Sequence, residues 1–191
     1  MFGEDYAHEV VLHTLLNRLA ADHGVSVEIH VRSATGGHGR MIQELKQYLA
    51  ELRRGRAPLP DLFVVARDAN CIGYADRVKE INAVVNDYQG FIGLAVPDPH
   101  MERWLLIDSH AFKEVLGKGC QAPDSKCDRD RYKQLLADAV RTAGVDPPLG
   151  GVEYAEEIIR AMDLDRASGN DVSFAHLLRD LRSAFHRWEV K

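Results

Sequence analysis

The chain has 191 residues, of which 46% are hydrophobic and 28% are charged, and its formal net charge is −5. These values fit one globular domain with a substantial core and argue against a uniformly basic surface that binds nucleic acid. No apolar run approaches the about 20 residues that cross a bilayer, and the first residues lack a secretion signal, so we expect a cytoplasmic protein without membrane contact. The three cysteines, Cys71, Cys120 and Cys127, predict free thiols because their number is odd.

The first third of the chain alternates between helical and extended patterns. Residues 1–5 lead directly into a helix, whose apolar stripe ends at Gly24. From 25 to 32, apolar and polar residues alternate strictly, which predicts a half-exposed strand near a sheet edge. A glycine-rich loop at 33–40 precedes an amphipathic helix over 42–52.

Two short apolar runs then predict buried strands. The first covers 62–66 and the second 91–96, and a helical pattern with inward positions at 75, 78, 81 and 85 separates them. A short helix over 101–108 follows, continuing or kinking into 111–117. Strands that alternate with helices favour a mostly parallel sheet with helices on its faces.

The last third has a different pattern. A polar loop at 117–130 is followed by helices over 131–143 and 152–162 and by a final helix that Ser173 caps. We therefore predict an α/β fold with a mostly parallel sheet flanked by helices and an all-helical C-terminal layer. Residues 1–116 would form the α/β core, and residues 117–191 a helical extension packed on it.

Oxygen-bearing side chains lie at the predicted strand ends. Asp68 and Asn70 follow the first buried strand and, two residues apart, point to one side in extended geometry. Glu4 and Glu102 each lie near another predicted strand end. Magnesium sites in phosphoryl-transfer enzymes use two or three carboxylates, so these residues are candidate ligands, although helix caps and solvated acids remain an alternative. Further acids would support the site: Asp5, Asp98 and Asp108.

Three segments, 3–9, 65–70 and 97–108, together resemble the Toprim family. More narrowly, the chain looks like the small stand-alone Toprim-like proteins encoded beside ATPases in bacterial defence loci, and the late segments 161–164 and 173–175 also resemble that group. The resemblance implies a Toprim-like fold and a Mg²⁺- or Mn²⁺-dependent nuclease of a phage-defence system, which hydrolyses phosphodiester bonds in DNA or RNA. It also implies a partner ATPase.

Site residues follow from the same resemblance. Glu4 matches the family's glutamate, a general acid/base or metal ligand, and Asp68 matches the first aspartate of its Asp-x-Asp motif. Glu102 matches the acid of its Glu-x-Trp-Leu-Leu element. Two departures are visible: Asn70 stands where a second aspartate is usual, and only three residues precede Glu4 where the family has a full strand. Both favour the alternative function, a catalytically weakened Toprim-like subunit that docks on the ATPase.

Two histidines at the N-terminus invite comparison with a zinc-protease helix. His8 and His13 form an HExxxH pattern, in which five residues advance the helix by about 500°. The two rings then lie on different faces, so we reject a shared zinc site.

The glycines at 36–39 lack a complete phosphate-loop motif, but Arg40 at the loop exit and Arg67 are candidates for contact with the nucleic-acid backbone.

The later cysteines leave one alternative open. Cys120 and Cys127, with His110 before them, have a wider spacing than structural zinc sites prefer, so two loop thiols are favoured over a zinc knuckle.

Overall fold

The computed structural model describes residues 1–33, 38–128 and 130–189. Most of the glycine-rich loop, including the glycines at 36 and 37, lies outside the described residues. Arg40 is described and lies exposed in the first turns of a helix.

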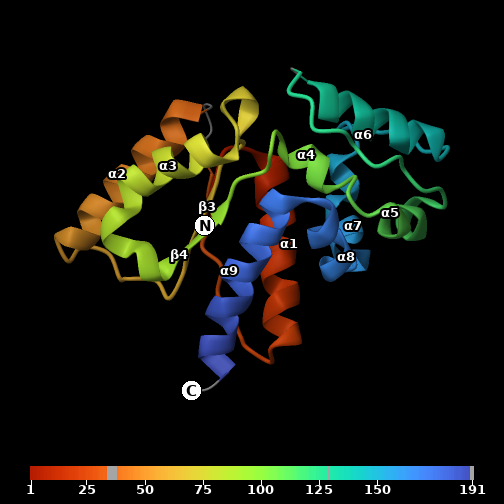
Figure 1. Cartoon of the computed structure of the whole chain (residues 1–191). Coiled ribbons are helices and arrows are strands. Elements are labelled where there is room, and N and C mark those ends of the chain that lie inside the picture. The colour runs from red at the N-terminus through yellow and green to blue at the C-terminus, as the bar shows by residue number, and fades with distance from the viewer. Residues whose placement is uncertain (34–37, 129, 190–191) are drawn as a thin grey trace.

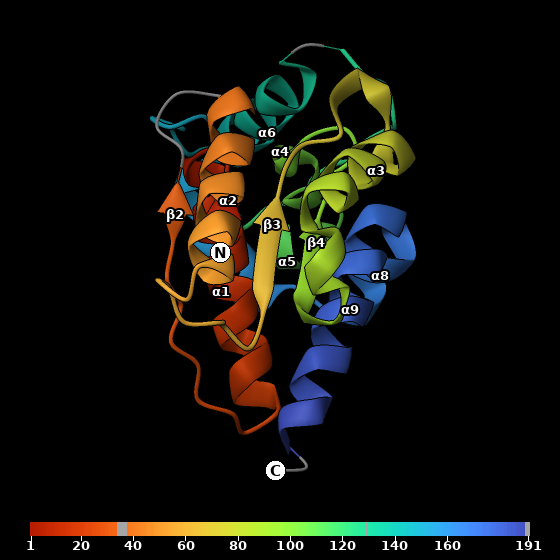
Figure 2. The same ribbon diagram turned by 90° about the vertical axis from the view of Figure 1, so that its left-hand side faces the viewer.

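Four parallel strands form one small sheet, in the order β2-β1-β3-β4. Figure 2 labels β2, β3 and β4 of this sheet. The bounds of the strands are β1 Phe2–Gly3, β2 Arg32–Ser33, β3 Phe63–Ala66 and β4 Ile92–Ala95. The two strands predicted from apolar runs are confirmed as β3 and β4. The α/β class with a parallel sheet is likewise confirmed, and most of the chain outside the sheet is helical.

The expectation that residues 1–5 lead directly into a helix is wrong, because Phe2 and Gly3 form an inner strand. Phe2 pairs with Arg32 on one side and Val65 on the other. A strand of two residues is too short to show a period, and it forms because neighbours bond it on both sides. The predicted strand over 25–32 is mostly wrong too, since β2 begins only at Arg32. Its alternation of half-buried and exposed residues is nevertheless present.

Helices surround the sheet. Their bounds are α1 Tyr6–Asp22, α2 His38–Arg53, α3 Tyr74–Val85, α4 Met101–Trp104, α5 Ser109–Leu116, α6 Arg131–Thr142, α7 Ala155–Ala161, α8 Leu164–Asn170 and α9 Val172–Glu189. Short 3₁₀ helices are η1 Asn70–Ile72, η2 Asn86–Phe91 and η3 Val152–Tyr154. The expected helix over 101–108 ends at Trp104. The final helix is capped by Asp171 and not by Ser173, because Asp171 Oδ1 accepts the backbone N–H of Phe174 at 2.8 Å.

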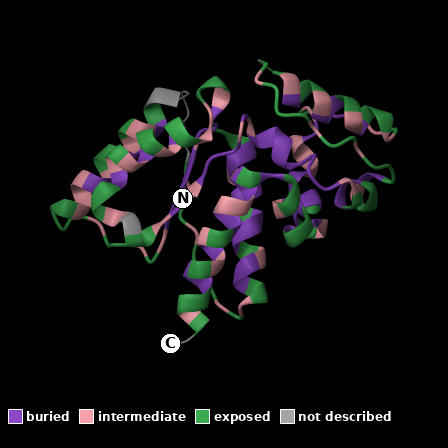
Figure 3. Ribbon diagram, in the orientation of Figure 1, coloured by how far each residue is buried: buried purple, intermediate pink, exposed green. Residues whose placement is uncertain are grey.

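Alternating strand residues divide the core into two clusters. Phe63 and Val65 pack with α2 and α3, and Val64 and Ala66 pack with α1 and α9 on the opposite face. Figure 1 shows these two helix layers on either side of the sheet, and Figure 3 shows buried residues concentrated between them. At Gly93 in β4, a Cβ would lie 3.2 Å from the side chain of Leu181 in α9, so glycine permits this close packing.

The C-terminal helices share a hydrophobic core with the N-terminal half. Leu177 and Leu181 of α9 belong to the same cluster as Leu12 and Leu15 of α1, and α7 also packs against α1. The division at residue 116 stays a prediction.

Over the ranges that the structure describes, no helix combines the length and apolar character needed to span a bilayer.

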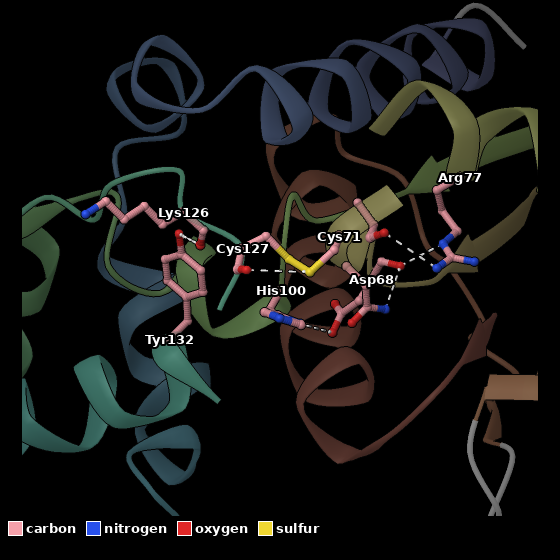
Figure 4. Close-up of a disulfide and its surroundings, with 9 residues drawn as sticks. Asp68, Cys71, Arg77, His100, Lys126, Cys127 and Tyr132 are labelled. Carbon is pink, nitrogen blue, oxygen red and sulfur yellow. Dashed lines mark hydrogen bonds and ion pairs between the residues drawn. A yellow bond between two sulfur atoms is a disulfide. The ribbon is translucent and has the colours of Figure 1, made fainter. Parts of the chain in front are cut away.

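A disulfide joins Cys71 in η1 to Cys127, 56 residues later (Figure 4). The expectation of three free thiols is therefore wrong, and Cys127 has no thiolate to offer a zinc knuckle. Cys120 is the free cysteine, and burial raises the pKa of its thiol to about 11. An odd cysteine count predicts at least one free thiol but does not show whether the other two meet in space.

Candidate metal centre

The candidate site lies at the carboxyl edge of the sheet, where Glu4 follows β1 and Asp68 follows the neighbouring strand β3. Backbone pairing continues past the strand ends, because Ala69 N donates to Pro97 O and Asn70 N to Pro99 O. This pairing brings the start of α4 beside Asp68. Acids predicted from distant segments therefore lie near one another at this edge.

His8 lies in the first turn of α1 and is only 1% exposed. The N-cap residue Asp5 accepts the backbone N–H of His8 at 3.2 Å, and its Oδ1 lies 2.8 Å from Nδ1 of the ring. The other ring nitrogen, Nε2, lies 3.1 Å from Oδ1 of Asp68. Burial alone would lower the pKa of His8, but the carboxylates of Asp68 and Asp5 outweigh it and raise the pKa to about 10.

Asp68 is the centre of this group of contacts. Its Oδ1 accepts the backbone N–H of Met101 at 3.0 Å, and its Oδ2 lies 3.1 Å from Nδ1 of His100 (Figure 4). Burial would raise the pKa of Asp68, but His8 and His100 hold it well below its usual range. The hydrogen bond with Asp68 is also the main reason that the pKa of His100 is raised.

Glu4 is buried, and Arg67 Nε donates to its Oε1 at 3.1 Å. The same guanidinium donates to Glu80 at 3.0 Å, so this candidate for nucleic-acid binding is engaged within the protein. One ligand atom each from Glu4, His8 and Asp68 lies within 4.8 Å of the other two. Two carboxylates and one imidazole are thus close enough for a single metal ion to bind all three after small side-chain movements, since metal–ligand bonds are about 2.0–2.2 Å long.

Glu102 borders a hollow of about 330 Å³ next to this group. Burial raises the pKa of Glu102, and repulsion from Asp68 and Asp5 adds to the rise, while Lys133 opposes it. The carboxylate therefore lies in the same negative field as the other acids. The hollow is lined by Asp5, Tyr6, Ala7, Glu102, Lys133, Leu149, Gly150 and Val152.

Three other predicted residues have structural contacts of their own. Asn70 has a φ of +50°, and its Nδ2 donates to the backbone oxygen of Asp68 at 3.3 Å. Asp98 Oδ2 accepts the backbone N–H of Tyr74 at the start of α3. Asp108 caps α5 and pairs with Arg166 at 2.7 Å.

Sequence reasoning missed the two histidines and the lysine of the site. His8 was considered only as a partner of His13, which is exposed on another part of α1. An Asp at the N-cap followed three residues later by His was the available signal, because that spacing brings the ring back to the cap. His100 and Lys133 had no comparable local pattern.

Comparison of the chain with family models, curated proteins and solved structures finds no match. The family resemblance therefore stays a prediction.

Proposed function

We propose that this chain is a metal-dependent nuclease with a Toprim-like fold, which hydrolyses phosphodiester bonds in DNA or RNA. One observation carries the proposal: Glu4, Asp68 and Glu102, from three distant segments, gather at the carboxyl edge of the parallel sheet beside an open hollow. Open α/β sheets bind their ligands at this edge.

The sheet topology supports the family resemblance. The family pattern needs a glutamate after a first strand and an aspartate after a later one, and here Glu4 follows β1 and Asp68 follows the adjacent β3. Two residues before Glu4 form the strand β1, although only three residues precede that glutamate where the family has a full strand. A role in phage defence with an ATPase partner remains part of the proposal on the resemblance alone.

The residues present fit a divalent cation. Carboxylate oxygens are the ligands that Mg²⁺ and Mn²⁺ prefer, and the positive charges of His8 and Arg67 balance the acids in the absence of an ion. A divalent cation bound at such a site polarises a phosphoryl oxygen and lowers the pKa of a bound water. Glu4 and Asp68 would hold it, and Glu102 at the hollow would give or accept a proton. Lys133 on the wall of the hollow would attract the phosphate.

The test is a cleavage assay on the full chain with labelled single-stranded DNA, double-stranded DNA and RNA, in Mg²⁺, Mn²⁺ or chelator. We expect cation-dependent cleavage that falls about 100-fold or more in Glu102→Gln, the range of general acid–base effects. The matched control is Glu156→Gln, an exposed glutamate in α7 that pairs with Arg160. Absence of cation-dependent cleavage with every substrate, in folded protein, would overturn the proposal.

A specific observation favours the rival function, a catalytically weakened subunit that docks on a partner ATPase. Asp68 already contacts His8, His100 and the backbone of Met101, and Glu4 is held by Arg67. Acids balanced in this way can be purely structural.

Thermal stability in the presence of cations separates the two functions. An ion at 100 times its Kd stabilises the fold by about 2.7 kcal/mol, which is about 5–11 °C in Tm for a chain of this size. A nuclease site should show this rise in Mn²⁺ or Mg²⁺. If neither the unmodified chain nor Asn70→Asp, which adds the family's second carboxylate, shows any rise, the docking subunit is favoured.

A further inference from the structure

The contacts of His8 match those of a histidine that binds a metal. Metal-bound histidines almost always donate their second ring N–H to a carboxylate, a backbone carbonyl or a water, which fixes the tautomer and the ring orientation. Asp5 lies 2.8 Å from Nδ1 and is itself positioned as the N-cap of α1. With Nδ1 directed at Asp5, Nε2 faces Asp68, and this nitrogen would offer its lone pair to a metal ion once it has lost its proton.

The environment of Nε2 supports the same role. This atom is fully buried, and no described residue gives it an aligned hydrogen bond, although Asp68 Oδ1 lies 3.1 Å away. A buried polar atom normally has a partner with good geometry. Nε2 lies 3.1 Å from Asp68 Oδ1, and one ligand atom each of Glu4, His8 and Asp68 lies within 4.8 Å of the other two.

We propose that His8 is a nitrogen ligand, together with Glu4 and Asp68, of a centre that binds a transition-metal ion such as Mn²⁺ in preference to Mg²⁺. The inference rests on the proposed function, because it names the metal of that same site. Imidazole nitrogen suits first-row transition metals, whereas Mg²⁺ favours an all-oxygen shell. One imidazole among the ligands therefore shifts the selectivity away from Mg²⁺.

Charge balance agrees with this assignment. Two carboxylates surround the ring closely enough to stabilise it as a cation when no metal is bound. The same negative charge would stabilise a divalent ion bound beside the ring.

The experiment is a titration of the full, chelator-stripped chain with Mn²⁺ alone, followed by electron paramagnetic resonance and its pulsed, nitrogen-sensitive form. We expect one Mn²⁺ to bind with a histidine nitrogen signal, and Mg²⁺ to displace it only in at least tenfold excess. Incorporation of ¹⁵N-histidine into the unmodified chain should change that signal, which tests the nitrogen ligand without any substitution.

The variant His8→Gln should lose the nitrogen signal and bind Mn²⁺ at least tenfold more weakly. The matched control is His13→Gln, an exposed histidine of the same helix that contacts Asn17, and it should retain both properties. Circular dichroism establishes that each variant is folded.

Mn²⁺ bound without a nitrogen signal would overturn the assignment of His8 and leave the proposed metal-dependent nuclease intact. A nitrogen signal that persists in His8→Gln would also overturn it and would point to His100, which contacts the other oxygen of Asp68. Failure of both Mn²⁺ and Mg²⁺ to bind would overturn the metal centre and the proposed function together.

Discussion

The contacts of Asp68 predict a large loss of stability when its charge is removed from the metal-free protein. Asp68→Asn keeps the size of the side chain but eliminates the carboxylate between His8 and His100. Asp68 Oδ1 also accepts a hydrogen bond from the backbone N–H of Met101 at 3.0 Å. Because His8 is fully buried, the variant must either bury a less compensated imidazolium or release its proton.

The size of the effect follows from two routes. Removing one partner of a buried ion pair costs about 3–5 kcal/mol. Independently, the pKa of His8 rises from 6.5 to about 10, and the roughly 3 pKa units that lie above pH 7 amount to about 4 kcal/mol at about 1.4 kcal/mol per unit. Asp5 contributes part of that rise and remains in the variant, so we expect a loss of about 3 kcal/mol, or about 6–12 °C in Tm.

The assay is urea unfolding followed by circular dichroism at pH 7 in the presence of a chelator. Asp138→Asn is the control, because Asp138 is an exposed aspartate on α6 whose pairing with Arg141 should contribute little. An unchanged or increased stability of Asp68→Asn would refute the reasoning. It would mean that repulsion among the acids, and not their attraction to His8, controls the energetics of the site.

The disulfide, the α5 cap and one glycine give three further predictions. Cys71→Ser, which opens the 56-residue link to Cys127, should lower the free energy of unfolding by up to about 4 kcal/mol in urea titrations. Hydrogen bonds, that from Arg166 foremost, hold the pKa of Asp108 below its usual value despite its burial. These contacts therefore stabilise the fold above about pH 4, and their contribution falls as the pH falls further. Asp108→Asn should lower the free energy of unfolding by about 2–3 kcal/mol at pH 7 and flatten the acid-unfolding curve. Gly151→Ala should lower the free energy of unfolding by about 1–3 kcal/mol, and with it the Tm. The reason is that φ is +96° and that a Cβ would lie 2.8 Å from a side chain of α6. A stability equal to that of the unmodified chain would contradict each prediction.

The fold was predictable where the sequence repeats a pattern. The apolar runs that became β3 and β4 are bounded by prolines and polar residues, and the helices around them have clear apolar stripes. The strand β1 was not predictable, because Phe2 and Gly3 acquire strand geometry only through pairing with β2 and β3. The cap of α9 was misplaced by two residues for a related reason: Asp171 and Ser173 both suit an N-cap, and only the backbone geometry distinguishes them.

The sequence indicated the acidic residues of the candidate site but not the histidines and the lysine beside them. Glu4, Asp68 and Glu102 stand next to strand ends or a helix start, which is information that the chain carries locally. The role of His8 depends on Asp5, three residues before it at the start of α1, and on Asp68, which follows β3. It therefore appears only when β1 and β3 lie side by side. The same limitation concealed the disulfide, whose cysteines are 56 residues apart.

The structure explains why asparagine suits position 70. Its φ of +50° lies in the left-handed region, which asparagine tolerates better than most residues, and its side chain bonds the backbone of Asp68. On the proposed ligand set, Glu4 and Asp68 supply two negative charges, which match one divalent ion, and His8 supplies a third donor without charge. A second aspartate would then add charge that a single ion does not need. On this ligand set, the neutral side chain of Asn70 and the imidazole of His8 would together suit a single divalent ion.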